Sequence, residues 1–235
     1  SLKNGVRCVY AAMPDASLTC LDLWCRAGSF EEEAGEEGIA HFLEHMVFKG
    51  STLLKPGEFD RQIETLGGSS NAATGFDDVH FYVLVPPSSV IKALQLLLNL
   101  VLEPSLNREE FQIERKVVLE EIAQYQDQPD EQIIQNLLKT CWPNHAYGRP
   151  ILGFKNSLLA ADPAKMRGFH RRLYKAENCC LSIAGCIPSE LSSFLENSPL
   201  AHLSSKNSIN SSPPPEPNLH FKVGTKEIKV PRLES

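Results

Sequence analysis

Hydrophobic and polar residues recur along the chain with two periods, which predict strands and helices in turn. Runs rich in β-branched and apolar residues predict strands at residues 5–12, 18–27, 78–86 and 179–185. Apolar residues at helical spacing predict helices at residues 36–48, 56–66, 88–102, 107–126, 130–141 and 162–173. We expect an α+β domain in which the helices pack on one face of a largely antiparallel sheet.

Length and composition predict one domain followed by a linker. The chain has 235 residues, 42% of them hydrophobic and 22% charged, which is enough for one buried core. We expect the core domain to occupy residues 1–203. Residues 204–217 are polar and Pro-rich, which is typical of a linker. Residues 218–235 are expected to form an extended tail or the start of a second half. The first residue is Ser and no secretory signal is visible, so we expect a processed or trimmed chain.

Charge, hydropathy and cysteine content narrow the choice of partners and compartment. The net charge of −6 argues against nucleic acid as a partner. The longest apolar segment, residues 90–101, contains Lys92, Gln95 and Asn99 and is too short to span a membrane, so it predicts a core helix. Seven cysteines without a close pairing motif indicate buried thiols in a reducing compartment, either the cytoplasm or an organelle stroma or matrix.

The stretch from His41 to His45, His-Phe-Leu-Glu-His, is the strongest chemical signal in the chain. On a helix, His41 and His45 lie one turn apart on one face, so their imidazoles can bind one metal ion with Glu44 beside them. The order His-x-x-Glu-His is the inverzincin signature, and it arises by chance in well under about 1% of chains of this length. A solvated helix face that happens to carry two histidines is the alternative.

A zinc site of this type needs a third protein ligand, usually a carboxylate from a second helix. Glu114 and Glu121 lie two turns apart on one side of the predicted helix 107–126, although either residue alone would be an ordinary solvated glutamate. Together with the His-x-x-Glu-His motif, this pair resembles the pitrilysin and insulin-degrading enzyme family, which includes the mitochondrial processing peptidases. The resemblance implies that Glu121 is the third Zn²⁺ ligand and that Glu114 orients a ligand or the catalytic water.

The resemblance covers roughly residues 2–190. Further matching segments are Asn4-Gly5-Val6, the Gly-Ser-x-x-Glu-Glu-like run from Ala27 to Glu32, Gly38-Ile39-Ala40-His41, Phe48-Lys49-Gly50-Ser51, and the segment from Gly67 to Thr74. The last segment matches the substrate-contacting edge strand of the family. The resemblance therefore implies that a peptide substrate pairs with Ser69, Ser70, Asn71, Ala72 and Ala73, with Asn71 as its side-chain contact.

The resemblance also implies an activity and a partner. Members usually have two homologous halves that close around a peptide, so we expect this chain to be the catalytic N-terminal half without its second half. The implied function is a zinc-dependent endopeptidase that acts on unfolded peptides or short polypeptides, with Glu44 as general base. In the family the second half supplies an Arg and Tyr pair that contacts the substrate. A lone half is therefore expected to be weak or inactive until it self-associates or meets a partner half.

Two other functions remain open from the sequence. One is a non-catalytic peptide-binding or assembly subunit of a processing-peptidase-like complex, although the residues expected for metal binding and catalysis are all present. The other is a purely structural zinc domain, which would need a fourth protein ligand.

An acidic run precedes the metal motif and includes Glu31, Glu32, Glu33, Glu36 and Glu37. It can favour basic peptides near the site. The alternative interpretation is a solvated loop and first helical turn, where acidic side chains interact favourably with the helix dipole. We favour it about two to one over peptide binding.

Overall fold

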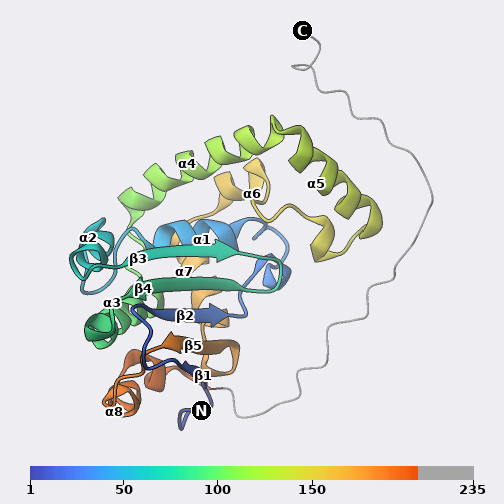
Figure 1. Cartoon of the computed structure of the whole chain (residues 1–235). Coiled ribbons are helices and arrows are strands. Elements are labelled where there is room, and N and C mark those ends of the chain that lie inside the picture. The colour runs from blue at the N-terminus through green and yellow to red at the C-terminus, as the bar shows by residue number, and fades with distance from the viewer. Residues whose placement is uncertain (206–235) are drawn as a thin grey trace.

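Five strands form a mixed sheet in the computed structural model of the chain, which describes residues 1–205 (Figure 1). The strands are β1 (Arg7–Ala12), β2 (Thr19–Cys25), β3 (Ser69–Thr74), β4 (Val79–Val85) and β5 (Cys179–Gly185), in the spatial order β1-β5-β2-β4-β3. The β1–β5 pair is parallel and the other three pairs are antiparallel. The expected α+β class and the expected edge strand are therefore confirmed.

Burial along the strands shows which face of the sheet carries the core. In β2, β4 and β5, fully buried residues alternate with half-buried ones, because successive side chains of a strand point to opposite faces. The buried members include Leu23, Phe81, Val83 and Leu181. Strand β3 lies at the edge, so its residues are exposed or half-buried. The edge position leaves one side of β3 open to a further strand.

Eight α-helices are present in residues 1–205. They are α1 (Ile39–Val47), α2 (Glu58–Thr65), α3 (Val90–Leu102), α4 (Arg108–Gln126), α5 (Pro129–Cys141), α6 (Lys155–Ala160), α7 (Pro163–Leu173) and α8 (Leu191–Glu196). All six predicted helices are found. The short helices α6 and α8 were not predicted, because six residues carry too little periodicity to be recognised.

The core lies between the buried face of the sheet and the helices α1, α3 and α7 (Figure 1). Helix α3 is buried around almost its whole circumference, as its nearly uninterrupted apolar sequence requires. Among the helices of residues 1–205, none combines the length and hydropathy of a bilayer span. All seven cysteines are free; Cys25 and Cys179 are buried, whereas the other five are only partly buried. Apart from Ser204 and Ser205, the predicted linker and tail lie outside the described residues.

Helix α4 crosses over α1 and brings its carboxylates toward the histidines (Figure 1). The Asn107 side chain caps α4 by accepting a hydrogen bond from the Glu109 backbone N–H at 2.7 Å. The buried residues of α4 are Phe111, Glu114, Val118 and Ile122, which form one stripe at helical spacing. Glu114 thus lies on the stripe that packs against the rest of the protein, not on the solvated side.

Candidate metal centre

Helix α1 positions the two predicted histidine ligands side by side. The rings of His41 and His45 meet edge to face, with centroids 4.7 Å apart. Most of the other side chains of α1 are buried in the core, so the helix has little freedom to rotate. His41 is itself buried and His45 is half-buried.

Glu121 of α4 reaches the same point as the two histidines. Its Oε2 atom lies 3.7 Å from His41 Nε2 and 3.5 Å from His45 Nε2. Ligand atoms around a tetrahedral zinc ion, each about 2.0–2.1 Å from the metal, are roughly 3.3–3.4 Å apart, so the observed spacing is close to that of a zinc site. Within the described part of the chain, no residue donates a hydrogen bond to the buried Glu121 Oε2. An ion shared by the three residues would satisfy this atom.

The three donors also leave room for a further ligand. Their ligand atoms lie within 4.8 Å of one another, and no fourth His, Cys, Asp or Glu of residues 1–205 joins the group. Three protein ligands of this type are typical of catalytic zinc sites, whereas structural sites have four. The donor set therefore fits Zn²⁺ at a site that stays open on one side.

Burial sets the protonation state of His41. Burial, together with a smaller contribution from the neighbouring His45, lowers the pKa of His41 to about 4. His41 is consequently neutral at pH 7. A neutral imidazole is the form that binds a metal ion.

Glu114 supports the site from behind His45, as predicted for a residue that orients a ligand. Its Oε1 atom lies 2.9 Å from His45 Nδ1, which directs His45 Nε2 toward Glu121. Its other oxygen pairs with Lys49 Nζ at 2.8 Å. Only 5% of Glu114 is exposed, so this lysine compensates a buried charge. Lys49 belongs to the Phe-Lys-Gly-Ser segment that follows the metal motif, but the sequence alone assigned it no role.

Glu44 lies beside the metal ligands and is bonded to the edge strand. The Thr74 hydroxyl donates a hydrogen bond to Glu44 Oε2. Burial raises the pKa of Glu44, and the hydrogen bond from Thr74 opposes that rise. Thr74 is a second residue beside the site to which the sequence assigned no individual role, because only the fold brings β3 against α1.

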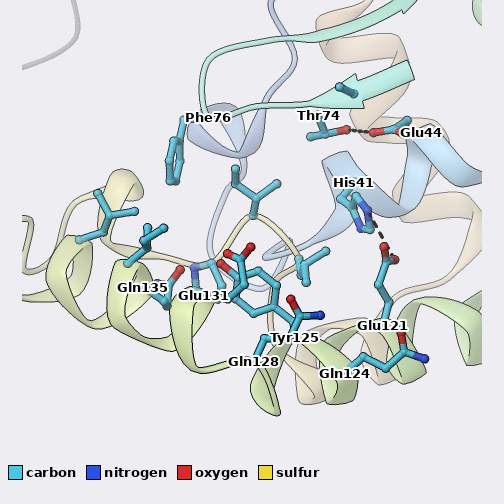
Figure 2. Close-up of a pocket in the computed structure, with 16 residues that line it drawn as sticks. His41, Glu44, Thr74, Phe76, Glu121, Gln124, Tyr125, Gln128, Glu131 and Gln135 are labelled. Carbon is cyan, nitrogen blue, oxygen red and sulfur yellow. Dashed lines mark hydrogen bonds and ion pairs between the residues drawn. The ribbon is translucent and has the colours of Figure 1, made fainter. Parts of the chain in front are cut away.

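Two hollows meet at Glu44. The larger, of about 630 Å³, lies between the metal ligands, the end of β3 and helix α5 (Figure 2). In Figure 2, Phe76, Tyr125, Glu131 and Gln135 surround the space beside His41 and Glu121. The smaller, of about 290 Å³, extends along β3 on the other side of Glu44. The catalytic candidate therefore sits midway along a groove.

The predicted substrate-binding residues lie along this groove with one exception. Ala73 lines the larger hollow, and Ser70, Asn71 and Ala72 line the smaller one. Ser69 belongs to β3 but lines neither hollow. The Asn71 side chain accepts a hydrogen bond from the Ala72 backbone N–H at 2.9 Å, so it covers a donor of the edge strand.

The favoured interpretation of the acidic run, a solvated loop, is wrong for two of its members. Glu32 is 5% exposed and Glu36 is 7% exposed. Glu36 Oε2 pairs with Arg172, and Glu32 Oε1 accepts hydrogen bonds from the backbone at the start of α1. These two carboxylates are therefore occupied within the protein rather than directed toward a basic peptide.

The chain matches a known family along most of its length. Residues 7–155 match the family described as insulinase, peptidase family M16. An uncharacterised zinc protease of Rickettsia bellii is 34% identical over 189 residues, which are 80% of this chain and 46% of that protein. The zinc protease PqqE of Helicobacter pylori is 30% identical, over 81% of this chain and 43% of that protein.

Solved structures agree with these matches. The crystal structure of a protease from Helicobacter pylori superposes with a TM-score of 0.84 at 27% identity, covering 94% of this chain and 53% of that one. The chain therefore spans about half the length of the relatives that it matches.

Removing any one ligand should abolish metal binding. We expect His41→Ala, His45→Ala and Glu121→Ala to lose the one zinc ion bound per chain, since two remaining donors hold zinc poorly. Glu120→Ala is the control, because Glu120 is exposed on the same helix. Elemental analysis of purified protein measures the zinc content. Full occupancy in Glu121→Ala would assign the third ligand to another residue, with Glu114 the first candidate.

Lys49→Met should weaken zinc binding without removing a ligand. The substitution leaves the buried Glu114 carboxylate without its cationic partner, so Glu114 holds His45 less firmly. We expect a loss of zinc affinity of about ten- to a hundredfold, measured by competition with a chelator. Lys55→Met is the control, because Lys55 is exposed. Equal affinities for the two variants would show that Lys49 has no part in the site.

Proposed function

Because the chain belongs to the insulinase family, peptidase family M16, we propose that it is the metal-binding half of a zinc-dependent endopeptidase. The observation that carries this proposal is the open three-donor site of His41, His45 and Glu121. Glu44 and an unpaired strand edge lie directly beside that site. The names of the relatives, which are zinc proteases, support the same chemistry.

His41, His45 and Glu121 would hold the metal, and Glu44 would carry the proton. When bound, Zn²⁺ supplies Lewis acidity that lowers the pKa of a water molecule and polarises the scissile carbonyl. Glu44 takes a proton from the attacking water and later returns it to the leaving amine. Thr74 holds the Glu44 carboxylate in place for both transfers through its hydroxyl. Glu114 and Lys49 keep His45 oriented during the reaction.

The edge of β3 would bind the peptide as an added strand. The hydrogen bond from Gly75 N–H to Asp78 C=O, at 2.8 Å, fixes the alternation of the β3–β4 ladder. Ser70, Ala72 and Thr74 therefore turn their backbone N–H and C=O groups away from β4, toward the open edge. A bound peptide has to displace the Asn71 side chain from the Ala72 N–H. This binding mode selects extended, flexible segments, which suits unfolded peptides as substrates.

The two alternative functions fit the site less well. A structural zinc domain would close the coordination sphere, whereas no fourth donor lies in the group within residues 1–205. A non-catalytic peptide-binding subunit would not need Glu44. Here Glu44 is half-buried, bonded to Thr74 and adjacent to both hollows, as a general base requires.

Glu44→Gln separates catalysis from metal binding. Gln keeps the size and hydrogen bonding of Glu but accepts no proton from water, so we expect normal zinc content and a loss of cleavage rate of at least about a hundredfold. Glu120→Gln is the matched control on an exposed site. Near-normal hydrolysis of a quenched peptide by Glu44→Gln, free of contaminating protease, would exclude the proposed role of Glu44.

Helix α5 bounds the larger hollow but contributes no buried residue to the core. No residue of α5 is buried, and Ile133, Ile134 and Leu137 are each more than half exposed. Exposed apolar side chains of this kind favour association with a partner. Since the relatives are about twice as long, we propose that a homologous second half, or a second copy of this chain, covers this region.

The 235-residue chain is therefore expected to bind zinc but to cleave peptides weakly when it is monomeric. Its specific activity should rise with protein concentration, because association completes the groove. Light scattering combined with a quenched-peptide assay over a concentration series tests this. Leu137→Asp should reduce association, whereas Lys139→Asp, a change at an exposed polar position of the same helix, should leave it nearly unchanged. Rapid turnover by a strictly monomeric chain would show that the half is a complete enzyme.

A further inference from the structure

The metal-binding helix α1 begins at a residue that cannot cap it. Helix N-termini are usually capped by a Ser, Thr, Asp or Asn side chain, which accepts a hydrogen bond from a free backbone N–H group. The cap position of α1 is Gly38, with φ +93°. A Cβ atom at Gly38 would lie 2.6 Å from the Leu152 carbonyl oxygen and 2.9 Å from Gly153 Cα. Both the backbone angle and the contact with Leu152 and Gly153 exclude a capping side chain here.

Glu32 supplies the missing cap from six residues upstream. Its Oε1 atom accepts hydrogen bonds from the backbone N–H groups of Gly38 and Ala40, both at 3.0 Å. Ala40 is the residue before the metal ligand His41. One buried oxygen thus satisfies two backbone donors in the turn that leads into the metal motif.

Arg149 lies against the same loop. Its guanidinium donates hydrogen bonds to the backbone carbonyls of Ser29 and Glu32, at 3.2 and 3.3 Å. The next three residues, Pro150 to Leu152, line the larger hollow. The Leu152 carbonyl oxygen is also the atom that a Cβ at Gly38 would meet first. The start of α1, the loop carrying Glu32 and one wall of the groove are therefore fixed together.

We propose that Glu32 is a positioning residue for the metal site, because it caps α1 and so fixes His41 and Glu44 relative to Glu121. This inference rests on the proposed function, in which these residues bind zinc and transfer the proton. It gives the acidic run a role inside the protein. Glu32 lies outside the metal motif, so substitutions at this position leave the metal ligands themselves unchanged.

The cap depends on the reach of the side chain rather than on its charge. Burial raises the pKa of Glu32 to about 8, while the hydrogen bonds from Ala40 and Gly38 and the charge of Arg149 act against that rise. A carboxyl group that is largely protonated near neutral pH still accepts hydrogen bonds through its carbonyl oxygen. The amide oxygen of Gln, at the same distance from the backbone, can replace it. Asp keeps the acid but is shorter by one methylene.

Zinc affinity in three variants of Glu32 tests the inference. By chelator competition, we expect Glu32→Gln to bind zinc within about threefold of the unchanged chain. Glu32→Asp and Glu32→Ala should bind at least about tenfold more weakly, because two buried N–H groups lose their acceptor. Glu33→Ala is the control, since the Glu33 side chain is 71% exposed. Hydrogen exchange at the Gly38 and Ala40 amides should quicken in the Asp variant and stay slow in the Gln variant.

The outcomes separate this inference from the proposed function. If Glu32→Ala does not fold, the comparison between Glu32→Gln and Glu32→Asp still tests it. Wild-type affinity in Glu32→Asp, or an equal loss in the Gln and Asp variants, would overturn the capping role. Failure of the unchanged chain to bind zinc would instead overturn the proposed function. A lower melting temperature with unchanged zinc affinity would show that Glu32 serves stability alone.

Discussion

The packing of α4 against α1 is the contact on which the site depends. The ring centroids of Phe42 in α1 and Phe111 in α4 lie 4.5 Å apart, and both residues are buried. This apolar contact sets the register of α4, so that Glu114 and Glu121, one and about three turns further along, reach the histidines. Glu114 and Glu121 are joined to α1 through the side chains of its histidines. The metal site is therefore as precise as the packing of this interface.

Several buried or half-buried carboxylates near the site are satisfied by partners that the fold brings to them. Glu114 is compensated by Lys49, Glu44 is bonded to Thr74, and Glu32 caps α1. A buried polar group without a partner costs free energy, so each of these pairings restricts how the surrounding loops pack. The same contacts therefore stabilise the fold and position the residues of the site. Within the part of the chain that the structure describes, two buried carboxylate oxygens have no hydrogen-bond partner, Glu32 Oε2 and Glu121 Oε2, and only the second belongs to the group of metal donors.

Periodicity predicted four of the five strands and the six longer helices, whereas the edge strand β3 was expected only from the family resemblance. The Glu114 and Glu121 pair was identified through its family spacing, since helical periodicity alone does not distinguish a ligand from a solvated glutamate. Thr74 and Glu32 could not be given roles from the sequence, because their partners are joined only by the fold. The two buried glutamates of the acidic run were misjudged for the same reason: charge suggests exposure, and burial requires partners that lie elsewhere.

The proposed zinc site consists of two imidazoles and one carboxylate and leaves one position open. X-ray absorption at the zinc edge of the loaded chain measures this directly. We expect four nitrogen or oxygen neighbours about 2.0–2.1 Å from the metal, two of them imidazoles, with one neighbour exchangeable for a small anion. A sulfur neighbour at about 2.3 Å, a third imidazole, or four ligands that all resist exchange would contradict it.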